Sequence, residues 1–279
     1  MRLNNILKKL RRKLFKMEIN ELYDLRNKVA VVTGGTGHLG KSISEGLAEA
    51  GAHVYLTSRN KKKAIETKNT FSKETRKQIS VETLNILSSE SVKKCFNRII
   101  DNSGQIDILV NNAAQISSGN YENISESEWN KTIDGTINGV YRCTKEIIPL
   151  MKKNQSGSII NISSIYGNVS PDNSIYGNTG LNSLPSYGAG KAAIIQYTKF
   201  MAGILGKEGI RVNSVSPGAF PTADIQNKSK FLTKLKKKIP LGRVGKPHEL
   251  KGIMVYLGSD SSSYVTGTNI MIDGGWTAW

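Results

Sequence analysis

Tyr187 and Lys191 are the pair of residues in this 279-residue sequence whose types and spacing point most clearly to chemistry. Residues four positions apart on a helix lie on the same face, one turn from each other. A free tyrosine, with a pKa of about 10, is a poor base at neutral pH, and a neighbouring positive charge favours its ionised form. The spacing therefore predicts an acid/base group at Tyr187, with a pKa that Lys191 lowers. Such a group can protonate an alkoxide that forms when a carbonyl accepts hydride, and can act as the base in the reverse direction.

A glycine-rich turn near the start of the chain joins an apolar, β-rich run at residues 29–33 to a helical pattern that begins near Lys41. Gly35, Gly37 and Gly40 satisfy the pattern G-x-G-x-x-G in the strand-to-helix context that this motif requires. Glycine lets the backbone approach a pyrophosphate, whose charge is held by amides at the helix N-terminus. The residues predicted to bind a dinucleotide here are Gly34, Gly35, Thr36, Gly37, His38, Leu39 and Gly40.

The end of the second β-rich run predicts which dinucleotide is bound. An acidic residue about 20 positions beyond the glycines would bind the ribose 2′-hydroxyl of NAD. Ser58 and Arg59 stand there instead, and they suit a 2′-phosphate through a hydroxyl hydrogen bond and a guanidinium ion pair. NADP(H) is therefore the favoured cofactor, with NAD(H) as the other possibility. The alternative for Arg59 is that it only begins the solvated basic run at residues 61–63.

Strands and helices alternate along the chain. The β-rich runs span residues 29–33, 53–58, 80–85, 108–111, 158–163, 211–215 and 269–272. Segments of helical periodicity span residues 41–50, 89–102, 126–152, 190–206 and 247–259. Apolar strands separated by helices predict a doubly wound parallel α/β sheet with helices on both faces. We expect one catalytic domain at residues 25–279 after an N-terminal extension at residues 1–24, with its ligands at the carboxyl ends of the strands.

Five motifs in order give the chain from about residue 25 onward a resemblance to the short-chain dehydrogenase/reductase family, in its compact single-domain branch. They are the glycine loop, Asn-Asn-Ala-Ala at 111–114, Asn-Ile-Ser-Ser at 161–164, Tyr-Gly-Ala-Gly-Lys at 187–191, and Pro-Gly at 217–218. The resemblance implies a Rossmann fold of about seven strands. It also implies an oxidoreductase that transfers hydride between nicotinamide C4 and a small-molecule carbonyl or secondary alcohol. No metal is expected.

The resemblance also assigns roles to residues. Ser164 would orient the substrate oxygen, and Lys191 would hydrogen-bond the nicotinamide ribose in addition to acting on Tyr187. The remaining residues expected around the cofactor are Asn85, Ile86, Asn112, Ala113, Ala114, Pro217, Gly218 and Thr222. A homotetramer or homodimer is implied, with the helices at 126–152 and 190–206 and the last strand at its interfaces.

The sequence departs from the family pattern at two positions in particular. His38 replaces a glycine in the cofactor loop, where it is either a surface residue or a phosphate ligand. Thr136 stands where the family usually carries an asparagine that supports a proton relay behind the lysine. Asn138 cannot replace that asparagine, because two residues correspond to about 200° of helix. Thr136 holds a water instead, or the helix is locally irregular.

The segment at 168–186 is longer than the family usually has and is predicted to shape the substrate pocket. Tyr176 within it is no rival to Tyr187, because Gly180 stands four positions later. Together with the lysine-rich segment 225–245, it is predicted to form a lid with a positive face, which suits an anionic sugar. The alternative is a solvated helix face. The motif around 166–177 is weakly similar to oxidoreductases of bacterial surface-sugar and flagellin modification, and residues 240–245 and 273–279 are similar to sugar and gluconate dehydrogenases.

The formal net charge of +17 is concentrated at the start of the chain. Residues 1–17 carry no acid, and their basic residues are Arg2, Lys8, Lys9, Arg11, Arg12, Lys13 and Lys16. Leucine, isoleucine and methionine recur among them at helical spacing, as in a helix that lies on a membrane surface. The alternatives are an unstructured extension or a start of translation at Met17.

Other partners and classes are disfavoured by the sequence. No aromatic-interleaved basic motif supports nucleic-acid binding. Cys95 and Cys143 lie among apolar residues at helical positions, which indicates core packing and a reducing, cytoplasmic location. A catalytically silent, NADP-binding regulator is the alternative function. It is disfavoured because Tyr187 and Lys191 are both present.

Overall fold

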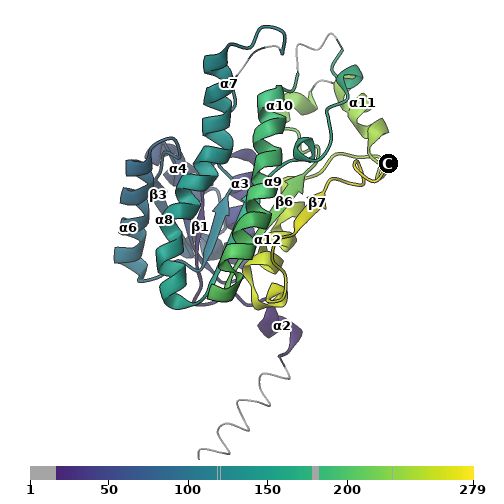
Figure 1. Ribbon diagram of the computed structural model, residues 1–279. Helices are drawn as coiled ribbons and strands as arrows, with labels where there is room; N and C mark the ends of the chain where they lie inside the picture. Colours follow the sequence, from purple (N-terminus) through teal and green to yellow (C-terminus); the bar gives the residue numbers. More distant parts are fainter. Residues whose placement is uncertain (1–16, 118, 120, 178–181, 228) are drawn as a thin grey trace, which may run out of the picture.

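A seven-stranded, all-parallel sheet forms the centre of the computed structural model, which describes residues 17–117, 119, 121–177, 182–227 and 229–279 (Figure 1). The strand order is β3-β2-β1-β4-β5-β6-β7. The strands are β1 (Val29–Val32), β2 (His53–Ser58), β3 (Ile79–Thr83), β4 (Ile108–Asn111), β5 (Gly157–Ile162), β6 (Ile210–Pro217) and β7 (Asn269–Ile272). The order reverses between β1 and β4, so a crevice for a ligand is expected at the carboxyl ends of these two strands.

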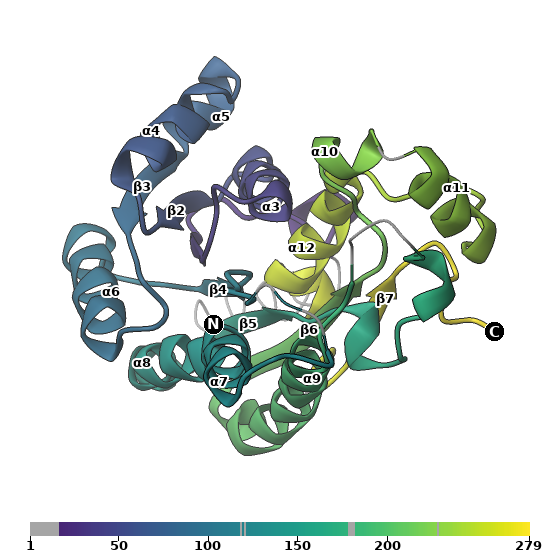
Figure 2. The same cartoon turned by 90° about the horizontal axis from the view of Figure 1, so that it is seen from above.

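Helices cover both faces of the sheet (Figure 2). One face carries α3 (His38–Glu49), α4 (Lys61–Asn69) and α12 (Lys251–Gly258), and the other carries α6 (Ser89–Ser103), α8 (Gly139–Asn154) and α9 (Pro185–Leu205). Two separate apolar clusters fill the spaces between the sheet and these layers. Every residue of β1 and β4 is buried, as expected for strands covered on both sides. The doubly wound α/β fold predicted from the sequence is confirmed.

Several element boundaries differ from those predicted. Helix α3 begins at His38, three residues before the predicted start, and α9 begins at Pro185, five residues early. Proline is favoured in the first helical turn because its missing N–H would have no partner there. The continuous helix predicted at 126–152 is wrong, because α7 (Glu126–Ile133) and α8 are joined by a π-helical segment, Asp134–Asn138.

Several short helices were not predicted from the sequence. They are α2 (Ile19–Leu22), α4, α5 (Lys73–Lys77), α10 (Ala223–Gln226) and α11 (Ser229–Lys238). Segments α4 and α11 are so rich in lysine that their apolar faces are narrow. In Figure 2, α4 and α5 lie at the β3 end of the sheet, and α10 and α11 lie at the β7 end.

Residues 1–16 lie outside the described residues, so the predicted membrane contact of this arm has no structural counterpart here. In the part of the chain that is described, no helix is both long and apolar enough to cross a bilayer. Cys95 and Cys143 are buried and unpaired, and burial raises the pKa of each thiol to about 12. The prediction that they pack in the core is confirmed.

Candidate active site

A groove of about 770 Å³ lies at the carboxyl ends of the central strands, where the strand order reverses. Of the residues predicted to bind the cofactor, all but two line it. Those that line it are Gly34, Thr36, Gly37, His38, Leu39, Gly40, Ser58, Arg59, Asn85, Ile86, Asn112, Ala113, Ala114, Tyr187, Lys191, Pro217 and Gly218. The exceptions are Gly35, which is buried behind the loop, and Thr222, which is exposed at the start of α10.

The glycine loop is closed by a very near approach of two backbone segments. A Cβ atom on Gly40 would collide with the carbonyl group of Gly34 and would lie 2.7 Å from Nδ2 of Asn112. Asn112 donates hydrogen bonds from this nitrogen to the carbonyl oxygens of Thr33 (2.9 Å) and Gly34 (3.1 Å). It therefore ties the end of β1 to the end of β4. His38 is the first residue of α3 and is exposed at the groove, so its side chain does not obstruct the loop.

Polar and basic side chains gather at the end of β2, where the adenosine ribose was predicted to lie. The hydroxyl of Ser58 accepts a hydrogen bond from Thr36 (3.3 Å). Nη1 of Arg59 donates to Oε1 of Gln115, 2.7 Å away on the segment that follows β4. Lys63 also lines the groove, although the sequence reading placed it in a solvated run. Two cations and a hydroxyl at one position fit a phosphate group better than an uncharged ribose.

The segment that follows β3 forms the side wall of the groove, where Asn85 and Ile86 were predicted to lie near the cofactor. Oδ1 of Asn85 accepts a hydrogen bond from the backbone N–H of Leu87 (3.2 Å). The backbone N–H of Asn85 donates to the hydroxyl of Ser91 (3.0 Å). Ile86 is 8% exposed and packs in the core beneath the groove. These contacts fix the wall in place.

Ser164, Tyr187 and Lys191 meet where this groove opens towards the substrate side. Ser164 follows β5, whereas Tyr187 and Lys191 lie one turn apart on α9. Nζ of Lys191 lies 5.7 Å from the centre of the Tyr187 ring and donates to the carbonyl oxygen of Ile162 (2.7 Å). The lysine is 4% exposed, and burial lowers its pKa to about 8. The three side chains are thus held by two neighbouring elements, as the sequence predicted.

The ionisation of Tyr187 differs from the prediction. Burial raises the pKa of Tyr187, a hydrogen bond with Ser164 opposes this rise, and the neighbouring Tyr166 adds to it. The predicted lowering by Lys191 is absent from these influences. Nζ of Lys191 donates instead to the carbonyl oxygen of Ile162. In this structure Tyr187 is therefore a neutral hydroxyl at physiological pH, which is the form that can donate a proton.

Thr136 lies in the π-helical segment behind the active site, so the predicted alternative of a locally irregular helix is confirmed. Its hydroxyl is buried and donates to the carbonyl oxygens of Thr132 (2.7 Å) and Ile133 (3.2 Å). A Cβ atom on Gly190 would collide with it, so the glycine allows α9 to pack at this point. Asn138 is exposed and donates to Asp134 (3.1 Å). Neither side chain takes the place of the family's asparagine.

A smaller cavity of about 220 Å³ continues from the groove on the far side of Tyr187. Its lining residues are Ser164, Ile165, Tyr166, Tyr187, Gly218, Ala219, Phe220, Pro221, Ile225, Phe231, Leu235 and Trp276. None of these described residues carries a charge. The predicted positive face of the lid therefore does not face this cavity. Lys234 and Lys238 of α11 instead bind the inserted segment, at the carbonyl of Ser174 (3.0 Å) and the carboxylate of Asp172 (2.8 Å).

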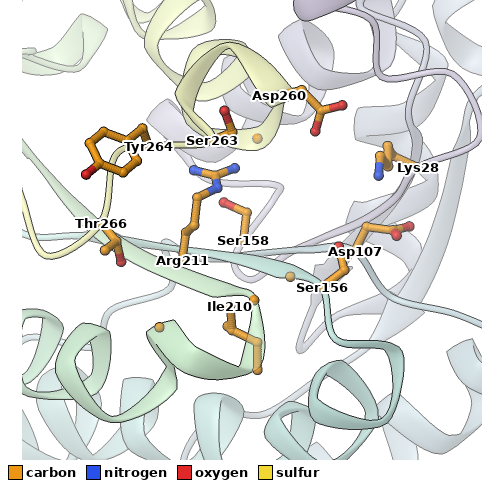
Figure 3. Close-up of a pocket in the computed structure, with 14 residues that line it drawn as sticks. Lys28, Asp107, Ser156, Ser158, Ile210, Arg211, Asp260, Ser263, Tyr264 and Thr266 are labelled. Carbon is orange, nitrogen blue, oxygen red and sulfur yellow. The ribbon is translucent and has the colours of Figure 1, made fainter. Parts of the chain in front are cut away.

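A third cavity, of about 550 Å³, lies at the amino ends of β5 and β6 (Figure 3). Lys28, Asp107, Arg211 and Asp260 surround it, and it includes no residue of the predicted site. The guanidinium group of Arg211 donates to the hydroxyl of Ser262 and to the carbonyls of Leu257 and Ser259. These bonds tie β6 to the end of α12, so the arginine serves the fold.

The chain matches known proteins over nearly its whole length. The family model described as enoyl-(acyl carrier protein) reductase matches residues 36–277. The 3-oxoacyl-(acyl carrier protein) reductase of Thermotoga maritima is 34% identical, over 90% of this chain and 98% of that protein. Sorbose reductase of Candida albicans is 36% identical, over 92% of this chain and 89% of that protein. A crystal structure of gluconate 5-dehydrogenase from Burkholderia cenocepacia, in complex with NADP and tartrate, has a TM-score of 0.85 at 27% identity and covers 94% of this chain and all of that one.

The protein is a nicotinamide-dependent oxidoreductase of the α/β class. It belongs to the short-chain dehydrogenase/reductase family and acts on carbonyl or CH–OH groups of small molecules. The family assignment made from the five motifs is confirmed, and the silent-regulator alternative has no support.

Proposed function

We propose that this protein is an NADP(H)-dependent reductase or dehydrogenase in which Tyr187 is the acid/base and Ser164 orients the reacting oxygen. The observation that carries the proposal is the position of Tyr187, which lines both the cofactor groove and the substrate cavity. When bound, the nicotinamide supplies or accepts hydride. Ser164 and Tyr187 then offer two hydroxyl groups to one substrate oxygen, and Lys191 holds α9 against β5 through the carbonyl of Ile162.

The preference for NADP(H) rests on the end of β2. The cationic side chains of Arg59 and Lys63 line the groove there, beside the hydroxyl of Ser58. Residues 58–60 are Ser, Arg and Asn, so this segment offers no carboxylate to bind a ribose 2′-hydroxyl. The complex of the gluconate 5-dehydrogenase with NADP is consistent with this preference.

A sugar or sugar derivative is the proposed substrate class. The names of two relatives, a sorbose reductase and a gluconate 5-dehydrogenase, support it. Because the cavity walls are uncharged, the part of the substrate that reaches Tyr187 is proposed to be neutral. If the substrate is the anionic sugar predicted from the sequence, its charged group must stay outside this cavity.

The test is oxidation of NADPH and NADH in the presence of ketoses, keto-sugars and β-keto thioesters, followed at 340 nm. We expect turnover with NADPH and a fall in kcat of about 10²- to 10⁴-fold in Tyr187→Phe, the contribution typical of a general acid. NADPH binding should be retained, as measured by fluorescence. If no carbonyl compound is reduced, or if Tyr187→Phe keeps its kcat, the proposed function is wrong.

We further propose that residues 25–279 form the catalytic domain and that it assembles as a homotetramer or homodimer. Phe200 and Ile204 on α9 are 64% and 51% exposed, and Tyr141 on α8 is 46% exposed. Strand β7 forms an edge of the sheet, where its unpaired backbone groups can meet a second copy. Light scattering should give a mass of two or four chains, and Phe200→Glu should shift it towards the monomer.

A further inference from the structure

A second tyrosine, Tyr166, lies at the substrate cavity. Tyr166 lies in a short 3-10 helix, Ile165–Gly167, directly after Ser164, and it lines the cavity together with Tyr187. Its hydroxyl lies 2.8 Å from the hydroxyl of Tyr176, which belongs to the insertion. The influence of Tyr166 on the pKa of Tyr187 indicates that the two side chains are close neighbours.

Tyr176 is itself held firmly in place. Its ring stacks on Phe231 of α11, with 5.7 Å between the ring centres. The insertion that carries it is bound to α11 by the ion pair of Asp172 with Lys238 (2.8 Å) and by the bond from Lys234 to Ser174 (3.0 Å). The lysines of α11 thus help to fix the position of Tyr176, the hydrogen-bond partner of Tyr166.

Tyr166 brings a polar side chain to a cavity that is mainly apolar. The walls are formed largely by side chains such as Ile225, Phe231 and Leu235. Burial raises the pKa of Tyr166, and the hydrogen bond with Tyr176 adds to this effect, so the group stays neutral at physiological pH. A phenol has one donor and two acceptor sites. Whichever tyrosine donates in the pair, Tyr166 keeps an acceptor site for another hydroxyl.

We propose that Tyr166, oriented by Tyr176, is a specificity-determining residue that accepts a hydrogen bond from a substrate hydroxyl next to the reacting carbonyl. The substrate class that fits is a neutral hydroxycarbonyl compound, in preference to a plain ketone. Tyr166 lies two residues after Ser164, the proposed partner of the reacting oxygen, and both line the same cavity, so the hydroxyl belongs on a carbon next to the reacting one. This inference rests on the proposed function and names the residue that recognises the hydroxyl of its substrate class.

The experiment compares three ketones of similar size as substrates with NADPH: hydroxyacetone, which offers a hydroxyl donor; methoxyacetone, which offers only an acceptor; and butanone, which offers neither. The wild-type protein should have its highest kcat/KM with hydroxyacetone. In Tyr166→Phe we expect the ratio of kcat/KM for hydroxyacetone to that for butanone to fall by about three- to tenfold, the value of one neutral hydrogen bond. The kcat/KM for butanone should change little, because phenylalanine keeps the ring in the wall.

Tyr176→Phe is the matched variant. It removes the partner of Tyr166 but keeps the stacking on Phe231, so it should lower the same ratio by less than Tyr166→Phe does. Methoxyacetone should behave like butanone in all three proteins. A purely structural role for Tyr166 would lower kcat/KM for every ketone alike and leave the ratio unchanged.

The outcomes separate this inference from the proposed function. A wild-type protein that reduces no carbonyl compound contradicts the proposed function. A protein that reduces carbonyl compounds without preferring hydroxyacetone over butanone contradicts the role of Tyr166 alone. The role of Tyr166 is also contradicted if the protein reduces larger carbonyl compounds but neither hydroxyacetone nor butanone. It is contradicted as well if Tyr166→Phe leaves the ratio of kcat/KM for these two ketones unchanged.

Discussion

The cofactor groove and the substrate cavity meet at Tyr187 but are built in different ways. The groove is lined by backbone and short side chains at the carboxyl ends of adjacent strands, with cations at one end. The cavity is lined by large apolar side chains from segments far apart in the chain, from Ile165 to Trp276. Sheet topology alone positions the groove, whereas the cavity depends on how an insertion packs against α11. The groove therefore follows from the fold, and the cavity follows from the packing of side chains.

A methyl group in the glycine loop gives the largest expected effect on the groove. In Gly40→Ala the new Cβ collides with the carbonyl of Gly34 and crowds Nδ2 of Asn112, and both contacts are with fixed groups. We expect NADPH affinity to fall by about 5- to 150-fold, because overpacking of about 1–3 kcal/mol must be relieved by moving the loop. Calorimetric titration with NADPH measures this change.

Gly203→Ala on α9 is the control, because its Cβ would meet nothing within 4 Å. It should leave NADPH affinity unchanged and stabilise the helix by up to about 1 kcal/mol. Equal NADPH affinity in Gly40→Ala and the wild type would show that the loop is not a rigid cradle. The groove would then resemble the cavity in depending on adaptable parts.

The next effect concerns the cationic end of the groove. Arg59→Ala should lower the ratio of kcat/KM for NADPH to that for NADH by about 10- to 100-fold, because a hydrogen bond to a charged group contributes about 1.5–3 kcal/mol. Lys63→Ala should act in the same direction by less, since a lysine makes a single-point contact. Lys61→Ala is the control, because Lys61 lies on α4 with Lys63 but does not line the groove. If all three variants keep the wild-type ratio, the specificity for NADP(H) has another origin.

The sequence predicted the groove much better than the cavity, and the reason is physical. Glycines that allow close backbone approach, and a tyrosine and a lysine one turn apart, act through local spacing, so Gly40, Tyr187 and Lys191 could be found from the chain alone. The contacts of Lys234 and Lys238 with the insertion join residues about 60 positions apart and leave no local pattern. The same lysines could be read equally well as an anion-binding face.

Two other differences arise from packing that propensity does not encode. The π-helical segment before α8 breaks a periodicity that reads as one continuous helix. The direction of the pKa shift of Tyr187 follows from burial, which sequence spacing does not reveal. Of these two features, only Tyr187 lies where the groove and the cavity meet.

Lys191 gives a prediction about stability at this meeting point. Its pKa is about 8 in the folded protein and about 10.4 in an unfolded chain, so between these values the unfolded state binds more protons. Relative to Lys191→Met, the free energy of unfolding of the wild type should therefore rise with pH above about 8, by at most about 1.4 kcal/mol per pH unit. The buried thiols of Cys95 and Cys143, whose raised pKa acts in the opposite sense, are common to both proteins and cancel from this difference. Urea denaturation of wild type and Lys191→Met at pH 8.0 and 9.5 measures this slope. The upper limit avoids the ionisation of Tyr187, whose raised pKa acts in the opposite sense above about pH 10.

The slope is a better measure than absolute stability in this case. Lys191→Met removes a buried charge, which stabilises the fold, but it also leaves the carbonyl of Ile162 without its donor. These two effects oppose each other at any single pH, whereas only the titrating ammonium group makes the difference between the two proteins change with pH. An equal slope in both proteins would mean that Lys191 keeps its ordinary pKa and is more accessible to water than the structure indicates.

The smallest expected effect tests the link between the insertion and α11. Asp172→Asn removes the charge that pairs with Lys238 but keeps an oxygen that can accept from the N–H of Ser174. Because the pair is partly exposed, we expect only a two- to threefold rise, as an approximate range, in the KM of the sugar substrate and no change in NADPH affinity. Lys238 lowers the pKa of Asp172 to about 2, so the carboxylate stays ionised at pH 4, and the contribution of this contact to stability should be lost as the pH falls from about 4 to about 2. Glu90→Gln, which breaks the ion pair with Lys94 on α6, is the control and should leave KM unchanged. A rise in KM with Asp172→Asn alone would establish that charges outside the cavity position its uncharged wall, and an unchanged KM would assign that task to the stacking of Tyr176 on Phe231.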